Sequence, residues 1–280
     1  VNTDTVISII GRVGLAVLTN YSLFYDPSII INDDIGIDPV WVNNILIVFN
    51  SFINDKKRII YTMKLYTDEL LPIGGNSVIA FDEKPLSAHS HSTRLIVSFS
   101  EKFTVYDFDK TKELIISGPP EKEGERKSMK IDDLIISFIT YSLSELNMDL
   151  KNHIIRAFIM WDNEVFLHLQ NNSVINIKNP TKPVWFNVLD SDDKKNNRSA
   201  MIWDNRSPQL LCCYKSGYIN ILSSNSIATL PINSMWTVNK EIIHISSNLQ
   251  YDRIQANFTD FSTKMMPIIS DDNVKYGETL

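Results

Sequence analysis

The stretch Leu95–Ser117 constrains the fold most, because its pattern predicts three strands separated by very short polar breaks. Apolar runs at Leu95–Phe99 and Leu114–Ile116 flank the segment Phe103–Phe108, in which apolar and polar residues alternate. Alternation at every second residue is typical of a strand. Three strands this close together along the chain predict an antiparallel meander.

The middle strand of this meander carries aromatic residues at positions that face opposite ways. Phe103 and Val105 fall on one face, whereas Tyr106 and Phe108 fall on the other. A strand with large apolar side chains on both faces is typically covered on both sides. We therefore expect this sheet to be packed between two neighbouring layers.

The same meander pattern occurs three more times along the chain. The additional copies are Val6–Tyr25, Phe166–Leu189 and Leu210–Ile232. Their polar breaks are rich in asparagine, serine and lysine, and asparagine favours tight turns. Four copies of one pattern indicate a repeat architecture.

Further strands are expected between the copies. Trp41–Phe49 and Ile59–Tyr66 flank the polar segment Asn54–Lys57 and predict a long hairpin. Shorter candidates are Ser77–Phe81, Asp133–Ser142, Ile154–Trp161 and Ala200–Trp203. The segment Leu143–Ile155 fits a single turn, a short helix or a loop.

About twenty strands with short connections leave two all-β architectures open. A β-propeller has four strands per blade and a repeat of about 40–45 residues, which predicts about six or seven blades in 280 residues. The alternative is two β-sandwich domains with a linker near Pro119. The repeated meanders favour the propeller, in which neighbouring blades protect most sheet edges.

The domain organisation predicted from these patterns is a single propeller over residues 1–280, as a piece of a larger chain, since it begins with valine. Polar, charged segments at about 119–130 and 190–198 predict loop insertions. The meander pattern does not continue in residues 242–280, and we expect this segment to be a partial blade or a trailing segment.

Charge and composition disfavour several classes of partner. The formal net charge is −6 and the isoelectric point about 5.4, whereas nucleic-acid-binding domains usually carry a basic stripe. The longest apolar run, Ile45–Phe49, is far shorter than the ~20 residues of a spanning helix.

Cys212 and Cys213 are adjacent, and we expect reduced thiols in a cytoplasmic protein.

The sequence contains no motif that predicts catalysis. Gly11 and Gly14 lack the third glycine of a dinucleotide-binding loop and predict a hairpin turn. His89 and His91 share one strand face but lack a third ligand, so we expect solvated histidines and not a zinc site. No phosphate-binding loop or nucleophile motif is present.

Carboxylates and tryptophans also fit structural roles better than functional ones. Asp192-Asp193 and Asp271-Asp272 lie in polar segments and predict solvated turns. The five tryptophans, at positions 41, 161, 185, 203 and 236, are spread as one packing residue per blade would be. We therefore assign no catalytic, cofactor-binding or metal-binding residues, and the partner-binding residues are unknown.

Three segments resemble one known family. They are the turn Gly11–Ala16 after Val6–Ile10, the segment Trp41–Val48 followed by Asn54-Asp55 and Leu65-Tyr66, and the segment Thr93–Asp107. Their order and spacing over about residues 6–110 resemble the second β-propeller region of the Ric subunit of the Golgi Ric–Rgp complex. That complex is a guanine-nucleotide exchange factor for Rab GTPases. A weaker similarity runs from Val184-Trp185 to Tyr218–Ile221.

The resemblance implies a scaffold role in a guanine-nucleotide exchange factor subunit that acts on a Golgi Rab GTPase of the Rab-six type. The implied partners are an arrestin-like Rgp-type subunit and the Rab. The implied location is cytoplasmic, on the peripheral Golgi membrane, with membrane association through the complex. Such a factor needs no cofactor and no small-molecule substrate, and no nucleic acid is expected.

Two other classes of function stay open at this point. One is a protein-interaction propeller of a vesicle coat, tether or nuclear pore scaffold. The other is a propeller hydrolase, which would require a carboxylate or metal cluster at the mouth of the propeller.

Overall fold

The computed structural model describes most of residues 35–177 and shorter stretches on either side. The described residues are 7–11, 14–18, 23–29, 35–112, 129–146, 153–160, 164–170, 173–177, 184–187, 201–204, 210–214, 218–222, 227–231, 242–247, 253–258, 260 and 262–267. Among them, no helix is long and apolar enough to cross a membrane. Both expected loop insertions lie almost wholly outside the described residues.

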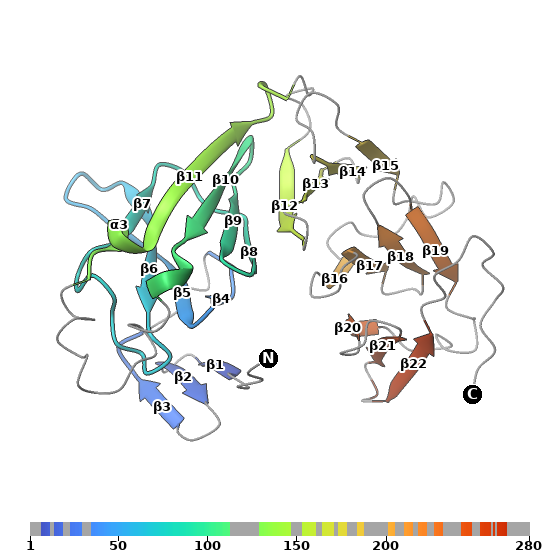
Figure 1. Ribbon diagram of the computed structural model, residues 1–280, viewed down its shortest axis with the longest axis horizontal. Helices are drawn as coiled ribbons and strands as arrows, with labels where there is room; N and C mark the ends of the chain where they lie inside the picture. Colours follow the sequence, from blue (N-terminus) through green and yellow to red (C-terminus); the bar gives the residue numbers. More distant parts are fainter. Residues whose placement is uncertain are drawn as a thin grey trace. The chain divides into compact units, whose positions relative to one another are not determined.

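The chain divides into two compact units, Val1–Phe158 and Ile159–Leu280. Three antiparallel sheets of the first unit follow one another along the chain, in the orders β1-β2-β3, β4-β5-β6-β7 and β8-β9-β10-β11. Their strands are β1 (Ile7–Gly11), β2 (Gly14–Leu18), β3 (Leu23–Asp26), β4 (Val40–Val42), β5 (Ile45–Ile53), β6 (Ile59–Tyr66), β7 (Ile79–Phe81), β8 (Ser87–His91), β9 (Arg94–Ser98), β10 (Lys102–Phe108) and β11 (Ile135–Ser142). Each sheet is a meander of neighbouring strands (Figure 1).

The remaining strands form three further sheets with the same simple order. Two have four strands, β12-β13-β14-β15 and β16-β17-β18-β19, and the third has the order β20-β21-β22. The strands are β12 (Ile154–Ile159), β13 (Val165–Leu169), β14 (Ser173–Asn176), β15 (Val184–Asn187), β16 (Met201–Asp204), β17 (Leu210–Tyr214), β18 (Tyr218–Leu222), β19 (Ile227–Pro231), β20 (Ile242–Ser247), β21 (Arg253–Phe258) and β22 (Thr263–Pro267). The unit boundary falls within β12. All four predicted meanders therefore contain strands where they were expected.

The meander around Leu95 differs from the prediction in its third strand. Strand β10 pairs with β9 on one edge and with β11 on the other, so both of its edges are occupied. The run Leu114–Ile116, expected as the third strand, lies outside the described residues. A 3₁₀ turn at Lys110–Lys112 ends the hairpin, and the short helix α3 (Ile131–Leu134) leads into β11.

The expected strand Trp41–Phe49 is in fact two strands. Strand β4 ends at Val42, β5 begins at Ile45, and the two pair directly as a hairpin. Asn43, in the turn between them, has a φ of 51°, in the left-handed region that asparagine tolerates. The prediction of one continuous strand was wrong because the apolar residues on both sides of Asn43-Asn44 were read together, although asparagine favours turns.

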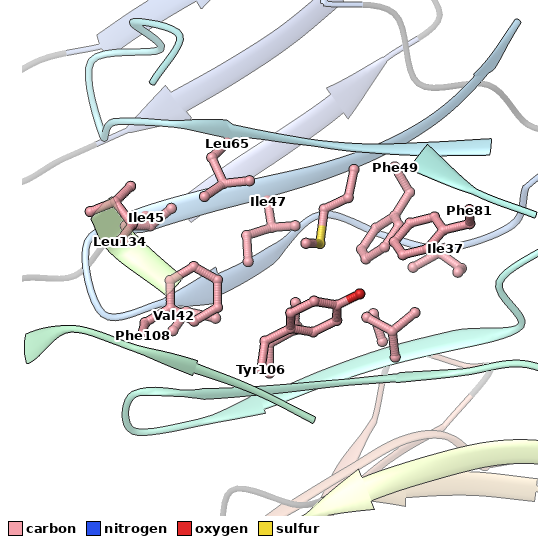
Figure 2. Close-up of a cluster of buried hydrophobic side chains, with 14 of the residues drawn as sticks. Ile37, Val42, Ile45, Ile47, Phe49, Leu65, Phe81, Tyr106, Phe108 and Leu134 are labelled. Carbon is pink, nitrogen blue, oxygen red and sulfur yellow. The ribbon is translucent and has the colours of Figure 1, made fainter. Parts of the chain in front are cut away.

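One apolar core joins the second and third sheets (Figure 2). It contains Ile45, Ile47 and Phe49 from β5, together with Tyr106 and Phe108 from β10. The ring of Phe81 in β7 lies 5.4 Å from that of Phe99, which follows β9. Successive sheets are therefore held together by interlocking apolar faces.

The opposite face of β5 is buried as well. Leu46 and Val48 pack in a second core with Leu15 and Val17 of β2. All four of these side chains are fully buried. The sheet β4–β7 thus packs on both faces, against the sheet before it and the sheet after it, as expected for one blade in a series.

Gly14 is required where β2 begins. Its φ is 145°, and a Cβ built there would lie 2.7 Å from Pro27 Cα and 2.8 Å from the Asp26 carbonyl oxygen. We expect Gly14→Ala to lower the free energy of unfolding by about 1–3 kcal/mol, measured by urea denaturation. The matched control is Gly36→Ala, because Gly36 has a φ of 70° and no atom near its missing Cβ. Equal losses in both variants would show that the close contact at Gly14 has no effect.

Candidate interaction surface

The described residues show no cluster suited to metal chemistry. Among them, no group of three or more His, Cys, Asp or Glu side chains is placed to hold a metal ion. Asp192-Asp193 and Asp271-Asp272 lie outside the described residues. Cys212 and Cys213 are consecutive residues of β17.

His89 and His91 both lie in β8, but His89 is not the solvated histidine that was expected. Its ring packs 4.4 Å from that of Phe158. Burial, with a smaller contribution from Arg156, lowers the pKa of His89 to about 3. Burial also lowers the pKa of His91. Burial in β8 therefore favours the neutral form of both rings, and the ring of His89 packs against Phe158.

His89 makes the stability of the first unit depend on pH. Because the folded state disfavours the protonated ring, the unfolded chain binds more protons between about pH 3 and 6.5, and stability falls as the pH decreases through that range. We expect a loss of about 1–2 kcal/mol between pH 7 and pH 5, measured by urea denaturation. The loss should be smaller in His89→Gln. An unchanged pH dependence in that variant would contradict this assignment.

Backbone and hydroxyl contacts hold β8 between its neighbours. The Ala157 N–H of β12 donates to Ser87 Oγ at 3.0 Å, and Ser87 Oγ lies 2.6 Å from Ser98 Oγ. On the other side, Ser90 Oγ donates to the Trp41 carbonyl oxygen in β4. The polar groups at this position link elements within the unit Val1–Phe158.

Trp41 is the one tryptophan whose side chain is described, and it has the expected packing role. It is half-buried against the core formed by Leu15, Val17, Leu46 and Val48. Trp185 and Trp203 lie in β15 and β16, in two further sheets. The side chains of these two residues lie outside the described part of the structure, as do Trp161 and Trp236.

The exposed apolar residues point to protein contacts. At the free end of the β5–β6 hairpin, Phe52, Ile53 and Ile59 are 51%, 70% and 55% exposed. On β11, Ile136 and Phe138 are 65% and 64% exposed. Large apolar side chains exposed in groups mark interaction surfaces more often than isolated ones do.

The hairpin end projects because its flanking strands stop short of it. Strand β4 pairs only with Ile45–Ile47 of β5, and β7 pairs only with Tyr61–Met63 of β6. The pairing of β5 with β6 continues to Ile53 and Ile59. The residue pairs of β5 and β6 nearest the turn therefore lie beyond the ends of β4 and β7.

Sequence analysis did not identify either surface. The pattern at residues 45–66 predicts a hairpin but not where its flanking strands end, and that difference exposes Phe52 and Ile53. The available signal was the basic run Lys56-Lys57-Arg58 between two apolar segments. For β11, the signal was an apolar strand next to a charged segment.

The fold class follows from the meander sheets, the double-sided packing of β4–β7 and the likeness to solved structures. The chain has an all-β, β-propeller fold. The solved structure of Raptor from Chaetomium thermophilum matches it with a TM-score of 0.55 at 7% identity, over 96% of this chain and 23% of that one.

Hsv2 from Kluyveromyces lactis matches with a TM-score of 0.52 at 8% identity, over 96% of this chain and 72% of that one. A second structure of the same protein gives 0.51 at 8% identity. At such low identities the likeness shows the fold alone. No protein-family model and no curated protein matches the sequence. The chain spans less than a quarter of the length of the Raptor chain it matches.

Proposed function

We propose that this β-propeller is the scaffold part of a guanine-nucleotide exchange factor subunit that acts on a Golgi Rab GTPase of the Rab-six type. The coarser statement, a β-propeller that mediates protein interactions, is supported by the fold and by its exposed apolar groups. The observation that carries the proposal is the resemblance of the segments around Gly11, Trp41 and Val105 to the Ric subunit family. All three segments contain strands of the first unit.

An exchange factor acts through a binding surface and needs no reactive side chains, which fits the proposed scaffold role. The factor binds the nucleotide-free GTPase more tightly than the loaded one, and by linkage it weakens nucleotide binding by the same factor. It does so by stabilising an arrangement of the switch segments that no longer holds the phosphate and Mg²⁺. This role requires no acid, base or nucleophile from the propeller.

The proposed setting follows from the same resemblance. The partners are an arrestin-like Rgp-type subunit and the Rab, in the cytoplasm at the Golgi membrane, with the membrane reached through the complex. The propeller needs no cofactor of its own.

The test measures nucleotide release from a Rab-six-type GTPase loaded with fluorescent GDP, with and without the complete complex that contains this chain. We expect release to accelerate at least about tenfold, within the usual range of coupling between two sites. EDTA, which removes Mg²⁺, is the control that shows the GTPase to be competent for release. Unchanged release in the presence of the complex would contradict the proposal.

A second class of function, an interaction propeller of a vesicle coat, tether or nuclear pore scaffold, is favoured by the same exposed apolar groups. Co-purification separates the two. The exchange factor predicts an arrestin-like subunit bound to the parent chain. A coat or pore scaffold predicts other structural subunits and no effect on nucleotide release.

A further inference from the structure

The free end of the β5–β6 hairpin, residues 52–60, combines apolar and basic side chains; we call it the hairpin end. Phe52, Ile53 and Ile59 are at least half exposed. Lys56, Lys57 and Arg58 are exposed at the turn, and Asp55 is the acidic residue beside them. Three positive charges and one negative charge leave the turn with a charge of +2, in a chain whose net charge is −6.

The hairpin end is held in one conformation by its own hydrogen bonds. The Asn54 side-chain oxygen accepts from the Lys56 and Arg58 N–H groups, both at 3.0 Å. The Asn54 N–H donates to the Arg58 carbonyl oxygen at 2.9 Å. Lys57 has a φ of 57°, which completes the tight turn. A preformed element loses little conformational entropy when it binds.

A second surface has the opposite charge; we call it the β11 edge. It begins at α3 with exposed Asp132 and Asp133 and continues along β11 with exposed Ile136, Phe138 and Ile139. Lys130 is also exposed there, so these three charged residues sum to −1. Strand β11 is the outer strand of its sheet, as Figure 1 shows.

The local structure of β11 leaves its apolar side chains on both faces of the strand. A register shift opposite Asp107 and Phe108 leaves Ile136 without a cross-strand partner. Phe138 pairs with Tyr106, and Ile139 pairs with Val105. An outer strand with exposed apolar residues is a surface on which another chain can associate.

The two surfaces are complementary in charge, and both expose apolar side chains. Each combines charged side chains with three exposed apolar ones, which flank the basic turn in the hairpin end and follow the acidic residues on the β11 edge. Both belong to the same compact unit and both are exposed, so a single copy does not bury one against the other. We propose that the hairpin end of one copy docks on the β11 edge of a second copy.

This contact joins two different surfaces and is therefore head-to-tail. A head-to-tail contact leaves one surface free at each end, so it builds larger rings or filaments in place of a closed dimer. A flat lipid surface fits less well. If the hairpin lay flat, only one of its faces would contact the membrane. If the hairpin inserted with its turn first, three positively charged side chains would have to pass the headgroup region before any apolar side chain entered.

Sedimentation of the 280-residue chain at increasing concentration tests the proposal. We expect the average mass to rise above 32.1 kDa with concentration and to fall when salt is added. Ile53→Ser/Ile59→Ser on the hairpin end should weaken association at least about tenfold, and so should Ile136→Ser/Ile139→Ser on the β11 edge. Leu23→Ser, at a 63% exposed leucine of β3, is the control and should change nothing.

Mixing the two double variants gives the decisive result. Each variant keeps the surface that the other has lost, so an equal mixture restores one contact. It should form a dimer that does not grow further, at concentrations at which each variant alone stays largely monomeric. A wild-type chain that stays monomeric at every concentration, or a mixture that stays monomeric, would overturn the proposal.

A charge exchange tests the same contact without removing apolar side chains. Lys56→Glu and Asp132→Lys should each weaken association by a few-fold, and the chain that carries both should recover it, because the opposite charges meet again. Neither residue makes a side-chain hydrogen bond on which the local fold depends among those the structure describes. Additive losses in the double variant would contradict the pairing of these two surfaces.

Discussion

Replacing Phe49 with alanine should lower the free energy of unfolding of the first unit by about 3–5 kcal/mol. Phe49 is 1% exposed in β5, and its ring stacks 6.4 Å from that of Phe81. The side chain lies in the core between the second and third sheets (Figure 2). The substitution leaves a cavity that rigid sheets on both sides cannot fill. Urea denaturation monitored by circular dichroism measures the loss.

Phe52→Ala is the matched control for this change. Phe52 lies three residues further along the same strand and is 51% exposed. We expect the control to lower stability by less than about 1 kcal/mol, as is usual for surface substitutions. Similar losses in the two variants would show that the face of β5 that carries Phe49 is not buried against a neighbouring sheet.

Phe103→Ala should have a similarly large effect, about 3–5 kcal/mol, for a different reason. Phe103 is 1% exposed and lies on the face of β10 opposite Tyr106 and Phe108, which belong to the inter-sheet core. Its ring stacks on that of Tyr141 in β11 at 5.2 Å. A large loss requires that the second face of β10 also be covered. The same urea measurement applies.

The control on this sheet is Phe138→Ala. Phe138 is 64% exposed on β11, and its ring lies 5.9 Å from that of Tyr106. Removing an exposed ring should cost less than about 1 kcal/mol. If Phe103→Ala costs no more than this control, the sheet β8–β11 has one solvent-facing side, and the chain is not built as a series of stacked blades.

Sequence periodicity predicted the strands well because alternation of apolar and polar residues follows directly from strand geometry. The burial of Phe103, Tyr106 and Phe108 on opposite faces of β10 confirms the expectation of double-sided packing. The class of fold, a β-propeller, is also confirmed. These features depend on local pattern or on its repetition.

Predictions that depended on pairing across long distances were less accurate. The partner of β10 is β11, which begins 27 residues after Phe108 ends β10, and no local pattern distinguishes it from the nearer apolar run Leu114–Ile116. The environment of His89 depends on Phe158, 69 positions away. A side chain's exposure is set by such distant neighbours, so the sequence alone did not reveal it.

The candidate surfaces were missed for the same reason. Ile53 and Ile139 resemble buried strand residues in their sequence context, and they are exposed only because neighbouring strands end early or because β11 is outermost. The basic turn at Lys56 was visible in the sequence, but its combination with exposed apolar residues depends on where β4 and β7 stop.

The central claim is that each sheet shares an apolar core with the next sheet along the chain. A double-mutant cycle on Phe81 and Phe99 tests this claim most directly. Phe81 lies in the sheet β4–β7 and Phe99 directly after β9 of the next sheet, with ring centroids 5.4 Å apart. The cycle uses Phe81→Leu, Phe99→Leu and the double variant. We expect a coupling energy of about 0.5–1.5 kcal/mol, as for aromatic pairs in contact. Losses that add to within about 0.3 kcal/mol would contradict a shared core.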